Sequence, residues 1–136
     1  MGTHLAHVQL NIDPQNSAFY RGLLELLGWP VIYEGDGFFG FGGAGRDSIW
    51  FHKASASTND YDGPGMNHIG IGTDAPADVD LVGAWLRGQG VDLLFETPRR
   101  RPEFVNDDDE TYYQIIFESP DRLQFEILYS GPTVDE

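Results

Sequence analysis

Two histidines and one glutamate are the residues of this chain whose types and spacing could hold a metal ion. His7 and His68 lie 61 residues apart, and each begins a short stretch in which apolar and polar residues alternate. Glu126 is a single carboxylate within an otherwise mostly apolar stretch. Two imidazoles and one carboxylate form the triad typical of open-sided Fe(II) sites, and the same donors suit Mn, Zn, Ni or Co. The residues therefore predict one divalent metal ion with positions left for a substrate.

Strands are the elements expected to position these three side chains. In each of the three stretches, the residues on either side of the candidate ligand are apolar or continue an alternating pattern. Successive side chains of a strand point to opposite faces of a sheet. If the apolar positions face helices, His7, His68 and Glu126 face the other side, and we expect the three to share one concave surface. A lone histidine on a strand is more often a hydrogen-bonded structural residue, so the repeated position of the histidines carries the argument.

The chain passes twice through the same order of expected elements. Each half has a strand, then a helix opened by a proline and closed by a glycine, and then three strands. In the first half the strands are expected at 7–12, 31–34, 38–41 and 48–52. In the second half a strand begins at His68 and others follow at 91–96, 111–117 and 123–129, with a long charged loop over 97–110. We expect one domain over 1–136, with module one at about 4–53, a linker at about 54–65 and module two at about 66–130.

These features resemble the vicinal oxygen chelate superfamily, which includes glyoxalases, bleomycin-resistance proteins and extradiol dioxygenases. The likeness spans roughly residues 4–130, and it is carried by His7 in His-Val-Gln-Leu-Asn-Ile-Asp, Phe19-Tyr20 followed by Leu26-Leu27-Gly28-Trp29, His68 in Asn-His-Ile-Gly-Ile, and Ser119-Pro120-Asp121 with Glu126 five residues after the aspartate. The resemblance implies an α+β fold in which two βαβββ modules pair into an open, barrel-like mixed sheet with the helices outside. It implies His7, His68 and Glu126 as metal ligands, and it favours a homodimer.

Two positions depart from the pattern of this superfamily. Trp50 stands where glyoxalase I has a fourth ligand, and an indole cannot bind a metal ion in that way. This favours chemistry of the dioxygenase or isomerase/lyase type. Arg122 stands where the turn of the superfamily usually has glycine. His52 lies two residues beyond Trp50 and could be a substitute ligand, an acid–base group or a histidine at the rim of the site.

The same strand alternation predicts the residues that contact a substrate. They are polar or aromatic residues expected on the inner face: Gln9, Trp50, Tyr112, Gln114 and Gln124. Tyr112, like His52, is a candidate for the catalytic base, although a tyrosine there is as often a simple part of the wall. Such a pocket suits a small, partly aromatic or carbonyl-bearing molecule.

A run of three arginines, Arg99, Arg100 and Arg101, lies between two prolines in an otherwise acidic chain. One hypothesis is that it anchors a substrate carboxylate, since the guanidinium fork matches that group. The plainer interpretation is a charge cluster in a loop, balanced by Glu103 and by the acidic residues 107–109. We favour the plainer interpretation.

The composition limits the classes of partner. The chain has 8 basic and 22 acidic side chains, a formal net charge of −14, and no cysteine. This charge argues against nucleic acid and against an anionic membrane surface as partners. Without thiolates, any metal must be bound by nitrogen and oxygen. The first residues lack the pattern of a secretion signal, and no apolar run could span a membrane, so we expect a cytoplasmic protein.

Two functions are consistent with these features of the sequence. The first is a metal-dependent enzyme acting on a small substrate that chelates the metal through vicinal oxygens, by dioxygenase or isomerase/lyase chemistry. The alternative is a non-catalytic protein that binds or sequesters a small molecule, as bleomycin-resistance proteins do. The charge of −14 supports the alternative for a cationic ligand, because an acidic groove would concentrate it. The three candidate ligands support the enzyme.

Overall fold

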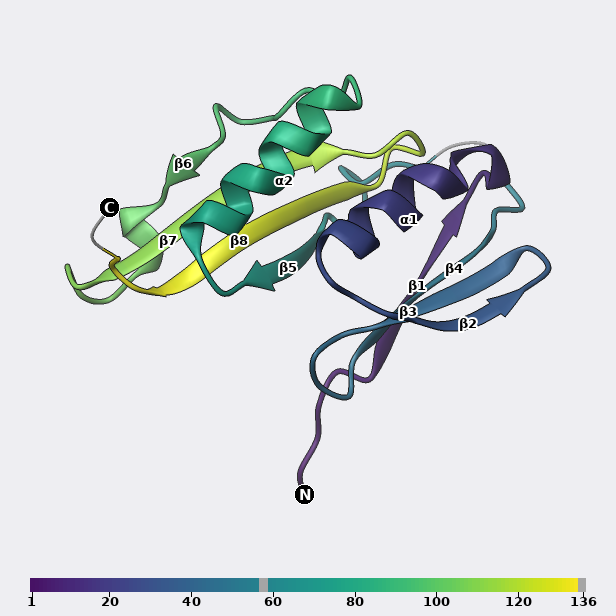
Figure 1. Cartoon of the computed structure of the whole chain (residues 1–136), viewed down its shortest axis with the longest axis horizontal. Helices are drawn as coiled ribbons and strands as arrows, with labels where there is room; N and C mark the ends of the chain where they lie inside the picture. The colour runs from purple at the N-terminus through teal and green to yellow at the C-terminus, as the bar shows by residue number, and fades with distance from the viewer. Residues whose placement is uncertain (57–58, 135–136) are drawn as a thin grey trace. The chain divides into compact units, whose positions relative to one another are not determined.

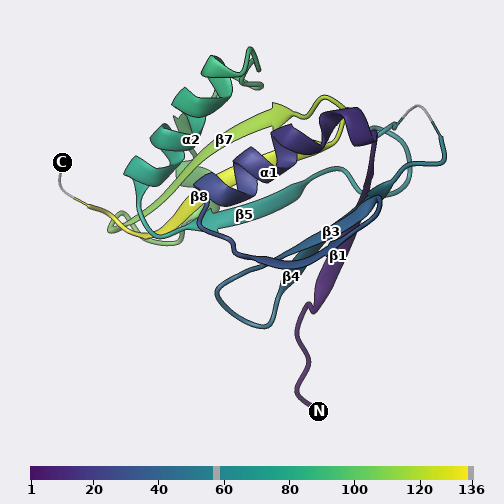
Figure 2. The same ribbon diagram turned by 45° about the vertical axis from the view of Figure 1, so that its right-hand side comes forward.

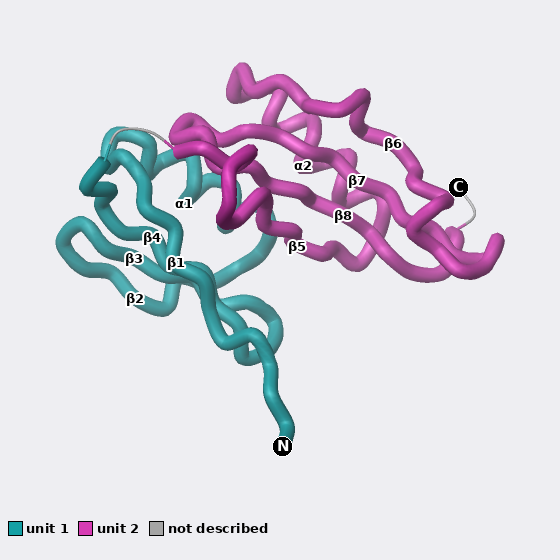
Figure 3. Tube along the Cα trace, turned by 180° about the vertical axis from the view of Figure 1, so that it is seen from behind, with its two compact units in different colours: residues 1–58 teal, residues 59–136 magenta. Residues whose placement is uncertain are grey.

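The chain folds into two compact units. A computed structural model describes residues 1–56 and 59–134 (Figure 1). Unit 1 spans residues 1–58 and unit 2 spans residues 59–136 (Figure 3). The boundary falls inside the predicted linker 54–65, of which residues 57–58 lie outside the described residues. That the two units work together as one domain stays a prediction.

Unit 1 is a four-stranded sheet with one α-helix. Its elements are β1 (His7–Ile12), a 3-10 turn (Pro14–Asn16), α1 (Ser17–Leu26), β2 (Val31–Gly35), β3 (Phe38–Gly42) and β4 (Ser48–Lys53). The strand order is β1-β4-β3-β2, with β1 parallel to β4 and the other pairs antiparallel. The Asp13 carboxylate caps the first turn by accepting from the backbone N–H of Gln15 at 3.0 Å. Gly28 ends the helical segment with a positive φ of 81°.

Unit 2 repeats this arrangement. Its elements are β5 (Ile69–Thr73), α2 (Pro76–Gly88), β6 (Arg99–Arg100), a 3-10 turn (Pro102–Phe104), β7 (Glu110–Glu118) and β8 (Gln124–Pro132). The order β5-β8-β7-β6 matches that of unit 1, and again the first strand is parallel to the last. Figure 2 shows α2 lying along the β7–β8 side of this sheet. The prediction of an α+β fold with two βαβββ modules is confirmed.

The expected strand at 91–96 is wrong. Within that segment Leu93 makes only an isolated bridge to Phe117. Phe95 and Glu96 have φ values of 56° and 59°, so the backbone turns in the left-handed region where a strand would have to continue. The second strand of the module comes later, at β6, where Arg99 pairs with Gln114. Alternating apolar residues therefore marked a turn that packs against the sheet.

Each helix covers the apolar face of the sheet in its own unit. In unit 1 the ring of Tyr20 lies 5.0 Å from that of Phe51, and both side chains are fully buried. In unit 2, Val79 and Leu86 of α2 are fully buried, as is Phe125 of β8. Burial of one such side chain stabilises the fold by roughly 1.5–3 kcal/mol. Polar side chains of the same strands are thereby left on the opposite face. Within the described residues, no helix is long and apolar enough to cross a membrane.

Candidate metal centre

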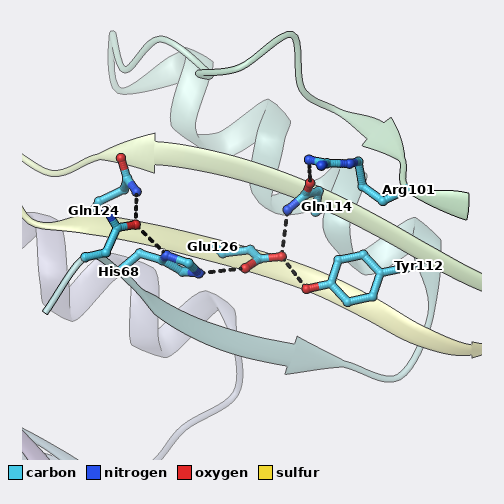
Figure 4. Close-up of polar contacts among 7 residues, drawn as sticks. His68, Arg101, Tyr112, Gln114, Gln124 and Glu126 are labelled. Atoms are coloured by element: carbon cyan, nitrogen blue, oxygen red, sulfur yellow. Dashed lines mark hydrogen bonds and ion pairs between the residues drawn. The ribbon is translucent and has the colours of Figure 1, made fainter. Parts of the chain in front are cut away.

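The carboxylate of Glu126 is the centre of a hydrogen-bond network on the face of the unit 2 sheet opposite α2 (Figure 4). Only 5% of this residue is exposed. Its Oε1 accepts from the hydroxyl of Tyr112 at 2.6 Å and from Nε2 of Gln114 at 2.7 Å. Both donors come from β7, whose antiparallel register pairs Ile116 with Glu126 and keeps alternate residues on this face. Two hydrogen-bond donors thus hold Oε1, and the other carboxylate oxygen, Oε2, points towards His68.

His68 lies on the other side of that carboxylate. Its Nε2 is 3.1 Å from Oε2 of Glu126, and its Nδ1 is 2.8 Å from Oδ1 of Asn67. Oδ1 of Asn67 also accepts from Nε2 of Gln124 at 3.0 Å. Because an amide oxygen only accepts, these partners assign the imidazole proton to Nδ1. In its neutral form the ring therefore directs the lone pair of Nε2 towards a carboxylate oxygen.

Two facing lone pairs need a proton or a cation between them. Metal–ligand bonds of imidazole nitrogen and carboxylate oxygen are roughly 2.0–2.2 Å, so two such ligands at right angles lie about 3 Å apart. The 3.1 Å between His68 and Glu126 fits two ligands of one ion. In residues 1–56 and 59–134 no cluster of three or more His, Asp or Glu side chains able to hold a metal is found. His7 lies in unit 1, and its place beside the pair stays a prediction.

Tyr112 acts here as a hydrogen-bond donor. Burial and the hydrogen bond to Glu126 raise the pKa of its phenol well above the ordinary value of 10, and the nearby Arg101 opposes this only in part. The phenol thus keeps its proton at neutral pH. This state suits a residue that orients Glu126 better than one that removes a proton from a substrate.

Gln124 contributes an acceptor next to this network. The residue is 7% exposed, and its Oε1 is buried with no hydrogen-bond partner among the described residues. A buried acceptor without a donor costs roughly 1–3 kcal/mol. The amide is held in this orientation because its Nε2 donates to Asn67. Its carbonyl oxygen therefore stays without a donor, enclosed by the surrounding residues.

Unit 1 has a polar and aromatic face of its own. The register pairs His7 with Ser48, Gln9 with Trp50 and Phe38 with His52, so these side chains lie on one face. Phe38 stacks against Trp50 with ring centroids 5.1 Å apart. The indole lies across Gly40, where an added Cβ would come within 2.6 Å of it. His52 is exposed, and its Nδ1 is 2.9 Å from the carbonyl oxygen of Lys53.

Comparison with known proteins identifies the fold of this chain. No family model and no curated protein matches the chain. Among solved structures, a proposed glyoxalase from Bacillus halodurans is 24% identical, with a TM-score of 0.75 over 92% of this chain and 94% of that one. A glyoxalase/bleomycin resistance protein from Albidiferax ferrireducens is 18% identical, with a TM-score of 0.72 over 92% of this chain and 98% of that one. This chain has the vicinal oxygen chelate fold.

A third neighbour with the vicinal oxygen chelate fold carries a metal. It is a mutant of the fosfomycin resistance protein FosX from Listeria monocytogenes, in complex with Mn(II) and 1S,2S-dihydroxypropylphosphonic acid. It is 20% identical, with a TM-score of 0.66 over 98% of this chain and 94% of that one. The resemblance predicted from the sequence is confirmed at the level of the fold.

The vicinal oxygen chelate fold of this chain brings together five of the residues selected from the sequence. In unit 2 these residues form one network: His68, Tyr112, Gln114, Gln124 and Glu126 (Figure 4). The other four candidates lie on the unit 1 face: His7, Gln9, Trp50 and His52. Their roles as ligands or substrate contacts stay predictions.

Sequence reasoning missed two members of the network. Asn67 orients His68, and its only signal was that it directly precedes that histidine. Arg101 donates from Nη1 to Oε1 of Gln114 at 3.0 Å, and its Nε also contacts Glu103 at 2.5 Å. The contact to Glu103 agrees with the interpretation of the three arginines as a loop charge cluster balanced by acidic residues. The contact to Gln114 is additional, and it connects Arg101 to the candidate metal centre.

Proposed function

We propose that this chain is a metal-dependent enzyme acting on a small substrate that chelates the metal through two neighbouring oxygens. His68 and Glu126 would hold one divalent ion together with His7. The observation that carries the proposal is the pairing of His68 Nε2 with Oε2 of Glu126 at 3.1 Å, while the other ring nitrogen lies 2.8 Å from the amide oxygen of Asn67. Orientation of a ligating histidine by a hydrogen bond at its other nitrogen is the usual design of metal sites.

The residues around the pair have separate tasks in this proposal. A bound divalent ion would supply Lewis-acid stabilisation of negative charge on substrate oxygens, or activation of dioxygen in the case of Fe(II). Tyr112 and Gln114 hold Oε1 of Glu126, and so keep the other oxygen directed at His68. Gln124 holds Asn67 through its Nε2, and its role as a substrate contact stays a prediction. His52, with Nδ1 turned to Lys53, keeps Nε2 for proton transfer and is our candidate base.

The neighbours of the same fold support this assignment. The compound bound with Mn(II) to the FosX mutant carries hydroxyls on adjacent carbons, which is the substrate chemistry that we propose here. The proposal covers both dioxygenase and isomerase/lyase reactions. The indole of Trp50 at the fourth ligand position favours these over glyoxalase I chemistry.

The experiment tests whether a metal ion bound to the protein coordinates a chelating molecule. Protein purified without a tag is stripped with a chelator, loaded with Mn(II), and titrated with catechol, which offers two vicinal oxygens, or with phenol, which offers one. Water-proton relaxation reports the displacement of water from protein-bound Mn(II). We expect catechol to displace water at concentrations where phenol does not. Equal effects of the two probes, or a parent protein that binds none of Fe(II), Mn(II), Zn(II) and Ni(II), would overturn the proposal.

The aromatic face of unit 1 favours a second candidate function, the binding of a planar molecule without catalysis. Phe38 and Trp50 form a stacked pair there, and the net charge of −14 would attract a cation. The test is a titration of chelator-treated protein with metal-free bleomycin, followed by tryptophan fluorescence. Tight binding that Trp50→Phe weakens and that Glu126→Gln leaves unchanged would favour this candidate. Absence of binding would favour the enzyme.

The remaining expectations are part of the same proposal. We expect a homodimer, because the superfamily resemblance favours one, and a cytoplasmic location. Sedimentation of the purified protein at several concentrations tests the dimer. A single species with the mass of one 15.2 kDa chain would contradict it.

A further inference from the structure

Arg101 is the outer end of a hydrogen-bond chain that leads to the candidate metal ligand Glu126 (Figure 4). Its Nη1 donates to Oε1 of Gln114 at 3.0 Å, and Nε2 of Gln114 donates to Oε1 of Glu126 at 2.7 Å. Gln114 is 2% exposed, so both ends of its amide depend on these partners. The two contacts connect a guanidinium to a carboxylate through one buried amide.

The polarity of this chain is set at both ends. A guanidinium only donates hydrogen bonds and a carboxylate only accepts them. With Arg101 at one end, the amide oxygen of Gln114 must face the guanidinium and its NH2 must face Glu126. The reverse orientation would place donor against donor and acceptor against acceptor. Arg101 therefore fixes which group Gln114 presents to Glu126.

Arg101 is itself held in place by several contacts. Its guanidinium lies 4.5 Å above the ring of Phe104, and its Nε donates to Glu103 at 2.5 Å. Its backbone N–H donates to the carbonyl oxygen of Tyr112 at 2.8 Å. The side chain is only 24% exposed, in contrast to the exposed Arg99 two residues earlier. This is the environment of an ordered side chain.

We infer that Arg101 is a positioning residue for the metal centre, acting through Gln114, which holds Oε1 of Glu126 together with Tyr112, so that Oε2 alone stays free to bind the ion. The inference rests on the proposed function. Its chemical consequence is a matter of coordination number. A carboxylate that binds through one oxygen leaves one more position on the ion than a carboxylate that binds through two. That position is needed by a substrate that chelates through two oxygens.

Coulomb's law gives the opposite expectation for the same residue. A guanidinium near a metal ion repels it, so removal of Arg101 by charge alone would tighten metal binding. If Arg101 instead orients Glu126, its removal frees Gln114, allows the carboxylate to turn away from His68 and weakens metal binding. Loss of a residue that supports a ligand typically lowers metal affinity by roughly 10- to 100-fold. The sign of the change thus separates the two roles.

The experiment is calorimetric titration of the chelator-treated full chain with MnCl2. The variants are Arg101→Met, which keeps an apolar stem over Phe104, and Arg101→Lys, which keeps a charged donor within reach of Gln114. Arg99→Met is the matched control, because it removes the same charge two residues away from an exposed position. Thermal unfolding of each metal-free variant accompanies the titrations, and affinities are compared among variants that unfold cooperatively. If Arg101→Met does not fold, the comparison uses Arg101→Lys and Gln114→Leu.

We expect Arg101→Met to bind Mn(II) at least about 10-fold more weakly than the parent, Arg101→Lys to recover part of that loss, and Arg99→Met to bind as tightly as the parent or more tightly. If Arg101→Met binds as tightly as Arg99→Met, the inference is wrong while the proposed function stands. A parent protein without affinity for Mn(II) or the other divalent ions overturns both. In the fallback pair, unchanged affinity in Gln114→Leu overturns the inference.

Discussion

His68 and Glu126 face each other with Nε2 3.1 Å from Oε2, although 58 residues separate them in the chain. The parallel pairing of β5 with β8 brings them together, since Gly70 lies opposite Glu126 and His68 precedes β5 by one residue. The same pairing leaves the backbone of β5 bare beside the carboxylate, because Gly70 and Gly72 occupy its inner face. The candidate metal centre is thus open along one strand.

Gly70 keeps the space beside Oε2 of Glu126 accessible. An added Cβ at Gly70 would lie 3.8 Å from Oε2 and 3.3 Å from a methyl group of Leu128, whereas a Cβ at Gly72 would meet nothing within 4 Å. We expect Gly70→Ala and Gly72→Ala to stay within about 1 kcal/mol of the parent in unfolding free energy. Only Gly70→Ala should weaken Mn(II) binding, by about 10-fold. Calorimetry and urea unfolding check both; equal metal affinity in the two variants would refute this role of Gly70.

Tyr112 stabilises the buried carboxylate of Glu126. Removal of its hydroxyl leaves Oε1 with the single donor Gln114, and a hydrogen bond to a charged group contributes roughly 1.5–3 kcal/mol. We expect Tyr112→Phe to lower the unfolding free energy of the metal-free protein by about 1.5 kcal/mol. Tyr113→Phe is the control, because that hydroxyl contacts Asp80 on the exposed side, and a loss within about 0.5 kcal/mol is expected. Similar losses in the two variants would contradict the account.

The ion pair of Arg21 with Glu34 predicts a pH dependence in unit 1. The hydrogen bond from Arg21 holds the pKa of Glu34 below its usual range, so the folded protein binds this proton less tightly than the unfolded chain does. The pair therefore contributes stability above the ordinary glutamate pKa of about 4.3, and the contribution is lost as the pH falls through the lower folded pKa.

Glu34→Gln removes this contribution. The difference in unfolding free energy between parent and variant should be largest near neutral pH and should shrink as the pH falls below about 4.3. Urea unfolding checks the prediction between pH 3 and 7, which is roughly the range on both sides of the ordinary glutamate pKa. A difference that grows towards acid would contradict it.

Arg122 occupies a left-handed position between β7 and β8. Its φ is 58°, a conformation that favours glycine, and its side chain contacts Glu118 at 3.3 Å and lies over the ring of Tyr61. Arg122→Ala loses these contacts and keeps the Cβ, whereas Arg122→Gly loses them and also relieves the strain. We expect the glycine variant to be about 1 kcal/mol more stable than the alanine variant. Thermal unfolding of the pair measures this; a less stable glycine variant would contradict it.

Much of the fold could be predicted because it depends on local signals. Alternation marks the strand around Leu10, and a proline marks the helical turn after Asp13. Alternation and the proline recur in the second half of the chain, where the helix begins without a side-chain cap. The strand at 91–96 failed because Phe95 and Glu96 adopt left-handed conformations that no apolar pattern reveals. Leu93 and Leu94 contact β7 through their backbone, but the side chain of Phe95 is exposed, so the apolar pattern there does not correspond to a buried strand.

In the candidate site, too, the residues on strands could be predicted from the sequence and the residues in loops could not. Strand alternation suffices to place Gln114 and Gln124 on the face of Glu126, because register and face follow from a period of two. Asn67 and Arg101 lie outside regular strands, and their contacts depend on loop backbone that has no period. Residues that orient a site from loops are therefore the part that sequence reasoning misses.

Metal binding by His68 and Glu126 is tested most directly by titration of the chelator-treated protein with Mn(II). The parent is compared with Glu126→Gln and with the matched control Glu110→Gln at the exposed end of β7. Glu126→Gln replaces the carboxylate of the His68–Glu126 pair, one of the candidate metal ligands, with a neutral amide. Glu110→Gln makes the same change of charge away from it. We expect one Mn(II) per chain in the parent and in Glu110→Gln, and binding at least about 100-fold weaker in Glu126→Gln. Unchanged affinity in Glu126→Gln would contradict it.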